Sequence, residues 1–126
     1  MRLVLVLLAL LTTLYAEHVR WQGDYEKARV EAQQEKKELL VMLMQPECSV
    51  CIKMLRSTFM NQAYISYINE NYVAVLITKG QKQSYPIELL YTLEYPALFF
   101  LDSHEIYTKD ALFGDISPKT LERHLK

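Results

Sequence analysis

The sequence contains few of the residues that build metal and haem sites. It has only two cysteines, and its three histidines, His18, His104 and His124, are scattered over the chain. A zinc site needs about four ligands. A c-type haem would need histidine directly after the C-x-x-C pair, where this chain has Ile52. We therefore expect neither a zinc site nor a haem site.

Clusters of basic residues are also missing. No run of lysine or arginine is longer than Lys36-Lys37, and the net charge of the chain is −1. Nucleic-acid-binding domains usually concentrate positive charge on one face or along one helix. We therefore expect no nucleic acid among the partners of this protein.

The length and composition fit a single domain. With 126 residues, 51% of them hydrophobic, the chain can form one compact core but is too short for two ordinary domains. The sequence also shows no internal repeat and no low-complexity linker.

The first residues, MRLVLVLLALLTTLYA, have the pattern of an export signal. Arg2 gives a positive start, residues 3–11 are uninterrupted and apolar, and Ala16 is a small residue at which a signal peptidase could cut. The apolar run is shorter than the roughly 20 residues of a membrane-spanning helix, so an uncleaved anchor is the weaker alternative. We therefore predict an exported protein with a signal peptide, residues 1–16, and one domain, residues 17–126.

Helical and strand periodicities alternate along this domain. A helix is predicted after an N-cap at Asp24, with Tyr25, Ala28 and Ala32 on its apolar face. Runs of apolar residues without alternation predict buried strands. The other expected elements are strands at 39–44, 72–78, 96–101 and 106–113, helices at 49–59, from 61 and from 117, and a short helical piece at 86–93. This order predicts an α/β fold with a mixed sheet and helices on both faces.

Three features together resemble the thioredoxin superfamily. The apolar strand LLVMLM runs into a C-x-x-C pair at a helix start, a second buried strand follows, and an aromatic-proline dipeptide opens a hairpin. More narrowly, the helix that runs into EKKELLV is similar to that of exported thioredoxin-like proteins of the Gram-negative periplasm. The resemblance covers residues 20–126. It implies the thioredoxin fold, a central mixed β-sheet flanked by helices, and thiol:disulfide oxidoreductase activity.

Cys48 and Cys51 form the C-x-x-C pair and have the chemistry for disulfide exchange. A thiolate attacks a disulfide, and the free N–H groups and dipole of a helix N-terminus favour the thiolate of Cys48. Cys51, one turn later, can attack the resulting mixed disulfide, so no cofactor beyond the pair is needed. We assign Cys48 as the nucleophile and Cys51 as the resolving thiol. A static disulfide is the alternative, but a bridge that closes so short a loop stabilises a fold little.

A copper-binding role is a second alternative. Met42, Met44 and Met54 lie close to the cysteines in sequence, and thioether and thiolate sulfur atoms suit Cu(I). Methionine in a buried strand, however, more often fills the core. The alternative protein would be a non-catalytic binding module with a structural disulfide or a Cu(I) site.

The resemblance also implies a role for Tyr95 and Pro96. In thioredoxin-like proteins the matching proline follows a cis peptide bond and faces the cysteines, which would bring Tyr95-Pro96 beside Cys48. A cis bond costs little only before proline. The backbone of Tyr95 would then dock an extended substrate segment, with Tyr85 and Tyr91 completing an aromatic rim. An ordinary proline at a strand start is the alternative.

Three positions depart from the thioredoxin pattern. Glu47 replaces the tryptophan before the first cysteine, Ser49-Val50 replaces Gly-Pro, and Met42 stands where thioredoxins bury an aspartate. The usual proton acceptor for Cys51 is thus missing, and Glu47, adjacent in sequence, is a candidate modulator that could take its place, although it is more simply a solvated loop residue. A carboxylate next to Cys48 also opposes thiolate formation. These departures favour a reductase, or an exchanger specific for its substrate, over a strong oxidant.

Taken together, the sequence predicts an exported, periplasmic thiol:disulfide oxidoreductase. It would act as a monomer on the thiols and disulfides of proteins, mainly as a reductase. A membrane partner would exchange electrons with its cysteine pair.

Overall fold

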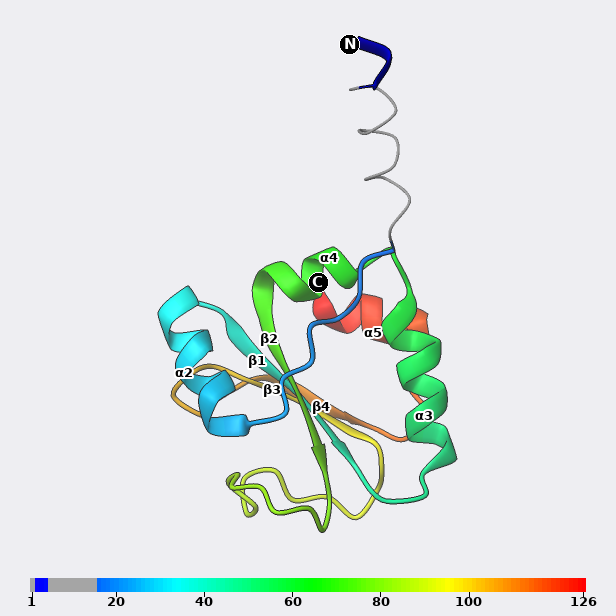
Figure 1. The fold of residues 1–126 in the computed structure, drawn as a ribbon. Coiled ribbons are helices and arrows are strands. Elements are labelled where there is room, and N and C mark those ends of the chain that lie inside the picture. The colour runs from blue at the N-terminus through cyan, green and yellow to red at the C-terminus, as the bar shows by residue number, and fades with distance from the viewer. Residues whose placement is uncertain (1, 5–15) are drawn as a thin grey trace.

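The structure is a computed structural model that describes residues 2–4 and 16–126 (Figure 1). Most of the predicted signal peptide, residues 1–16, lies outside the described residues. Among the described helices, none is both long enough and apolar enough to cross a membrane. The region that carries the predicted domain, residues 17–126, is described throughout.

Four strands form one mixed sheet. They are β1 (Glu38–Met44), β2 (Tyr72–Thr78), β3 (Ala97–Leu101) and β4 (Tyr107–Phe113), in the spatial order β2-β1-β3-β4. β1 and β2 are parallel, whereas the β1–β3 and β3–β4 pairs are antiparallel. All four strands agree with the predicted segments to within one residue at each end. The prediction of an α/β fold with a mixed sheet is confirmed.

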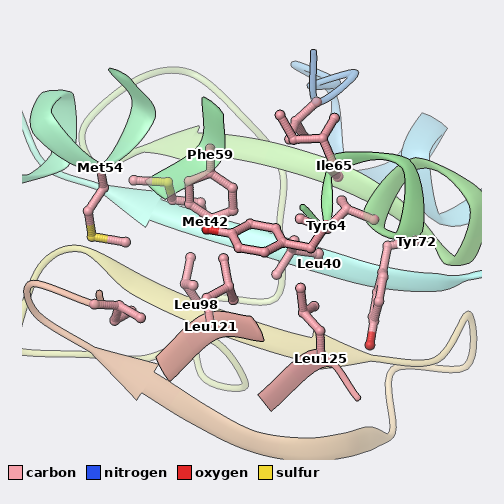
Figure 2. Close-up of a cluster of buried hydrophobic side chains, with 14 of the residues drawn as sticks. Leu40, Met42, Met54, Phe59, Tyr64, Ile65, Tyr72, Leu98, Leu121 and Leu125 are labelled. Carbon is pink, nitrogen blue, oxygen red and sulfur yellow. The ribbon is translucent and has the colours of Figure 1, made fainter. Parts of the chain in front are cut away.

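Helices cover both faces of this sheet (Figure 1). They are α2 (Tyr25–Glu35), α3 (Ser49–Arg56), the 3-10 helix η1 (Thr58–Met60), α4 (Ile65–Asn71) and α5 (Pro118–Leu125). Successive residues of β1 point to opposite faces. Leu40 and Met42 pack with α3, α4 and α5 in the cluster of Figure 2, whereas Leu39, Val41 and Leu43 pack with α2. The central strand is therefore buried on both faces, as its unbroken apolar sequence predicts.

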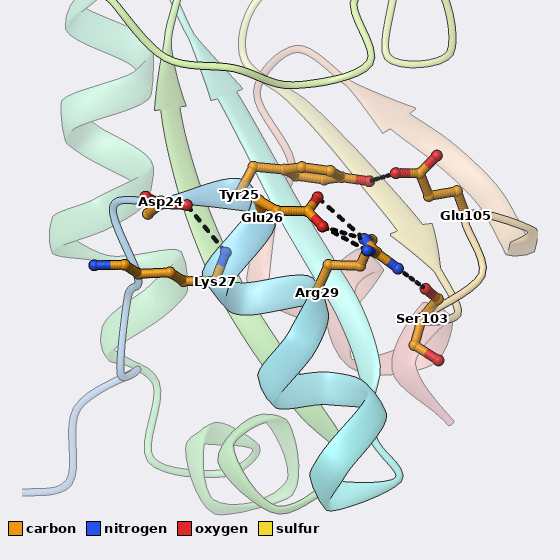
Figure 3. Close-up of polar contacts among 7 residues, drawn as sticks. All are labelled: Asp24, Tyr25, Glu26, Lys27, Arg29, Ser103 and Glu105. Carbon is orange, nitrogen blue, oxygen red and sulfur yellow. Dashed lines mark hydrogen bonds and ion pairs between the residues drawn. The ribbon is translucent and has the colours of Figure 1, made fainter.

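Helix α2 begins and packs as the sequence predicts. The Asp24 carboxylate accepts a hydrogen bond from the Lys27 amide at 3.0 Å and caps the helix (Figure 3). The buried residues of the helix are those of the predicted apolar face, Tyr25, Ala28 and Ala32. The Tyr25 hydroxyl donates to Glu105 Oε1 at 3.2 Å, which ties the start of α2 to the β3–β4 turn.

Two helices are shorter than the sequence suggests. The helix predicted at 49–59 ends at Arg56, where the Ser57 hydroxyl donates to the Lys53 carbonyl at 2.7 Å and the chain continues as η1. The helix predicted from residue 61 begins only at Ile65, because the Asn61 side chain first accepts a hydrogen bond from the Ala63 amide at 3.0 Å. In both places a short polar side chain competes with the helix for backbone groups.

The predicted helical piece at 86–93 is a single turn rather than a helix. The Leu90 amide donates to the Pro86 carbonyl at 3.0 Å. The Thr92 hydroxyl then donates to the Glu94 carbonyl at 2.7 Å and accepts from the Glu94 amide at 3.0 Å, which ends the turn. Leu90 points into the core, and three neighbours remain exposed: Ile87, Tyr91 and Leu93.

Candidate active site

The two cysteines lie at the start of α3, just beyond the end of β1 (Figure 1). Cys48 is the N-cap residue of α3 and forms a disulfide with Cys51 across a Cα–Cα distance of 5.2 Å. Cys48 is half-buried, whereas Cys51 is fully buried. A substrate can therefore reach Cys48 from solvent but cannot reach Cys51 directly.

The start of α3 is suited to negative charge on Cys48. The first amide groups of a helix have no carbonyl partner within it and can donate to an anion. Here the Cys51 amide donates to Cys48 Sγ at 3.1 Å. In the reduced pair the same amide is placed to donate to a Cys48 thiolate, a charge-assisted and stronger hydrogen bond.

Cys51 lies in the buried cluster on the α3 side of the sheet. Met42, Met54 and Phe59 belong to the same cluster, and each has at most 1% of its surface exposed (Figure 2). Met42 therefore fills core space at the position where thioredoxins have an aspartate. Within the described part of the chain, no aspartate or glutamate is buried.

The Tyr95–Pro96 peptide bond is cis, as the resemblance implies. Ala97 pairs with Leu43, so Pro96 lies beside the end of β1 from which the chain continues to Cys48. The Pro96 carbonyl accepts a hydrogen bond from the Gly114 amide at 2.8 Å, which fixes this segment to the end of β4. The structure thus brings Tyr95-Pro96 and the cysteines to the same end of the sheet.

The predicted tyrosines gather at this end of the sheet as well. Tyr85, Tyr91 and Tyr95 line one hollow of about 170 Å³, together with Leu43. The Lys79 ammonium lies 5.7 Å from the centre of the Tyr95 ring, within reach of a cation–π contact. Lys79, directly after β2, also lines this hollow, which therefore lies under the loop that joins β2 to β3.

Glu47 is exposed and adjacent to Cys48, with a φ of 59° in the left-handed region. Its carboxylate is thus solvated, whereas Cys51 is fully buried. The prediction that Glu47 modulates the pair stays open. Among the residues that the structure describes, no three histidine, cysteine or acidic side chains gather as a metal site would require.

The structure adds Ile52 to the site, which the sequence argument used only against haem. Its amide donates to the Cys48 carbonyl at 3.2 Å, and its side chain is 42% exposed. Ile52 and Cys48 line the same open hollow of about 350 Å³. Their spacing of four residues places them on one face of α3, and this spacing was the available signal.

Comparisons with known proteins agree with this geometry. A family described as thioredoxin-like matches residues 20–103, while no curated protein matches the chain. A thioredoxin from Thermus thermophilus is structurally similar over 86% of this chain and 85% of its own, with a TM-score of 0.71 and 16% identity. A putative disulphide-isomerase from Bacteroides thetaiotaomicron is similar over 86% and 92%, with a TM-score of 0.70 and 21% identity.

A third similar structure is a DsbH oxidoreductase. The similarity covers 78% of this chain and 74% of that one, with a TM-score of 0.63 and 17% identity. Identities this low establish a shared fold and nothing finer. The family match, however, spans well over half of the sequence, and the protein therefore belongs to the thioredoxin-like family.

Proposed function

We propose that the protein is an exported thiol:disulfide oxidoreductase that reduces disulfides of protein substrates. The asymmetry of the cysteine pair supports this best: the half-buried Cys48 caps α3, whereas Cys51 is fully buried one turn later. This is the arrangement that an attacking and a resolving thiol need. The export-signal pattern and the resemblance to periplasmic proteins support a periplasmic monomer with a membrane electron-transfer partner.

The proposed reaction has two steps. The Cys48 thiolate attacks one sulfur of the substrate disulfide, forms a mixed disulfide and displaces the first substrate thiol. Cys51 then attacks Cys48 Sγ, closes the Cys48–Cys51 disulfide and displaces the second substrate thiol. Two electrons pass from the protein to the substrate, and the two protons of the dithiol end on the product thiols. The Tyr95 backbone would hold the substrate segment in an extended conformation.

Cys51→Ser is expected to trap the mixed disulfide. The reduced variant, incubated with insulin as a defined disulfide substrate, should form an adduct between Cys48 and an insulin chain that dithiothreitol releases. Non-reducing electrophoresis and mass spectrometry detect this adduct. Cys48→Ser, which retains only the buried Cys51, is the matched control and should form none. If the wild type reduces no insulin and Cys51→Ser forms no adduct, the pair is a structural disulfide or a Cu(I) site.

The reduction potential of the pair tests the direction of electron flow. Negative charge on Glu47, next to Cys48, disfavours the thiolate and with it the reduced form, which makes the pair a better reductant. We expect a potential near the roughly −270 mV of thioredoxin in a titration against dithiothreitol. Glu47→Gln should make the potential less negative. A wild-type value near about −120 mV would mark an oxidant and contradict the reductase direction.

A further inference from the structure

The hollow that Cys48 lines is mainly apolar. It is formed by the end of β1, the turn before α3, the first turn of α3 and the end of β2. Its lining includes Met44, Pro46, Glu47, Cys48, Ile52 and Thr78. Met44, Pro46 and Ile52 contribute apolar side chains to the lining beside Cys48, and the volume of about 350 Å³ is enough for a large side chain.

The hollow and the Tyr95-Pro96 segment lie against different edges of the central strand β1, at the end that leads to Cys48. Met44 pairs with Thr78, so the hollow is on the β2 side of β1. Ala97 pairs with Leu43, so Tyr95-Pro96 is on the β3 side. Cys48 itself lines the hollow, so a residue next to the reacting cysteine of a docked polypeptide comes within reach of it.

The charge that lines the hollow is of one sign, negative. Of its lining residues, all of which the structure describes, only Glu47 carries a charge. Glu47 is exposed, so its carboxylate can pair with a positively charged group of a substrate while it stays solvated. Ile52, 42% exposed, leaves apolar surface in water that a substrate side chain would cover.

We propose that this hollow is a specificity site for the substrate polypeptide. It binds an apolar side chain that neighbours the reacting cysteine, and Glu47 selects for a basic residue close by. The proposal rests on the proposed function, because it concerns the substrate of the same cysteine pair. It makes Ile52 and Glu47 residues that determine which protein disulfides are reduced.

Symmetric peptide disulfides test this proposal. The probes are disulfide-linked dimers of blocked Lys-Leu-Cys-Leu-Lys, Lys-Ser-Cys-Ser-Lys and Glu-Leu-Cys-Leu-Glu, whose equal flanks make the result independent of binding direction. The reduced protein converts each dimer to two peptide thiols and becomes oxidised. The rate constant is measured by chromatography after acid quenching and is divided by the rate constant of the same dimer with dithiothreitol, which corrects for intrinsic reactivity.

The wild type should reduce the Lys-Leu peptide about tenfold faster than the Lys-Ser peptide, a fraction of what full burial of leucine can supply. Ile52→Ser should lower this ratio to about threefold or less. Ile106→Ser is the matched control, because Ile106 is 63% exposed and precedes β4 at the opposite end of the sheet. This control should keep the tenfold ratio.

The wild type should prefer the lysine-flanked over the glutamate-flanked leucine peptide by about threefold. Glu47→Gln should remove this preference, and added salt should weaken it in the wild type.

An unchanged leucine-to-serine ratio in Ile52→Ser, with all peptides still reduced, would overturn the specificity site and leave the proposed oxidoreductase activity standing. A wild type that reduces none of the peptides and no insulin would overturn both.

Discussion

Replacing Met42 by aspartate is expected to lower the free energy of unfolding by about 5 kcal/mol. Met42 is fully buried in β1, between Leu76 of β2 and Leu98 of β3. Truncating a buried methionine costs about 2–5 kcal/mol. A buried carboxyl group without hydrogen-bond partners adds about 1–3 kcal/mol even when it is protonated. Urea denaturation of the oxidised protein measures the change.

Two variants separate the contributions to this loss. Met42→Leu keeps the apolar volume and should cost less than about 1.5 kcal/mol. Met60→Asp makes the same chemical change at a methionine that is 37% exposed, and it should cost far less than Met42→Asp. A loss below about 1 kcal/mol for Met42→Asp would mean that this cluster tolerates a carboxylate, as that of thioredoxins does. Packing of the core would then not be the reason that position 42 holds a methionine.

The strands could be predicted because their signal is local. β1 is apolar at almost every position, which only a strand covered on both faces explains in an α/β chain. The N-caps of α2 and α5, Asp24 and Ser117, were likewise visible in the sequence. The ends of α3 and α4 were not, because side-chain hydrogen bonds from Ser57 and to Asn61 set them. Such bonds compete with helix geometry at a single position and leave the periodicity intact.

The candidate site was predictable in part for the same reason. The cysteine spacing and the aromatic-proline dipeptide are local features, and the resemblance assigned them. The hollow beside Cys48 is not local, because Met44 and Thr78 meet only through the parallel β1–β2 register. Residues 45–49 and Ile52 complete it from the loop and the first turn of α3. No periodicity in either segment predicts that pairing, so the four-residue spacing from Cys48 could place Ile52 on the same helix face, but the hollow that the two residues share is visible only in the fold.

Alkaline pH is expected to unfold the protein between about pH 10 and pH 12. Burial raises the pKa of Tyr64 from 10.0 to about 12, with Glu122 adding to the shift. Burial also raises the pKa of Tyr25 and of Tyr72, helped by Glu105 and Glu38 respectively. Because the folded state favours the neutral phenol, this stabilisation is complete below pH 10 and is lost as the pH rises through the folded-state pKa.

For Tyr64 alone the loss is about 3 kcal/mol, since each pKa unit corresponds to about 1.4 kcal/mol. Tyr25 and Tyr72 act in the same direction. Together the three losses can offset the free energy of unfolding of a small domain, about 5–15 kcal/mol. The urea midpoint should therefore fall steeply above pH 10, together with a cooperative rise in tyrosinate absorbance. The Cys48→Ser/Cys51→Ser double variant should show the same fall, which separates it from disulfide cleavage by base.

Tyr64→Phe identifies the group responsible. At pH 7 it should cost about 1 kcal/mol, because the Tyr64 hydroxyl donates to the Thr58 carbonyl in the core. Between pH 9 and pH 11, however, its stability should fall less than that of the wild type, since one buried phenol no longer ionises on unfolding. Tyr91→Phe, at a side chain that is 62% exposed, should keep the wild-type pH dependence. Equal urea midpoints at pH 9 and pH 11 in the wild type would show that the buried phenols ionise without unfolding the domain.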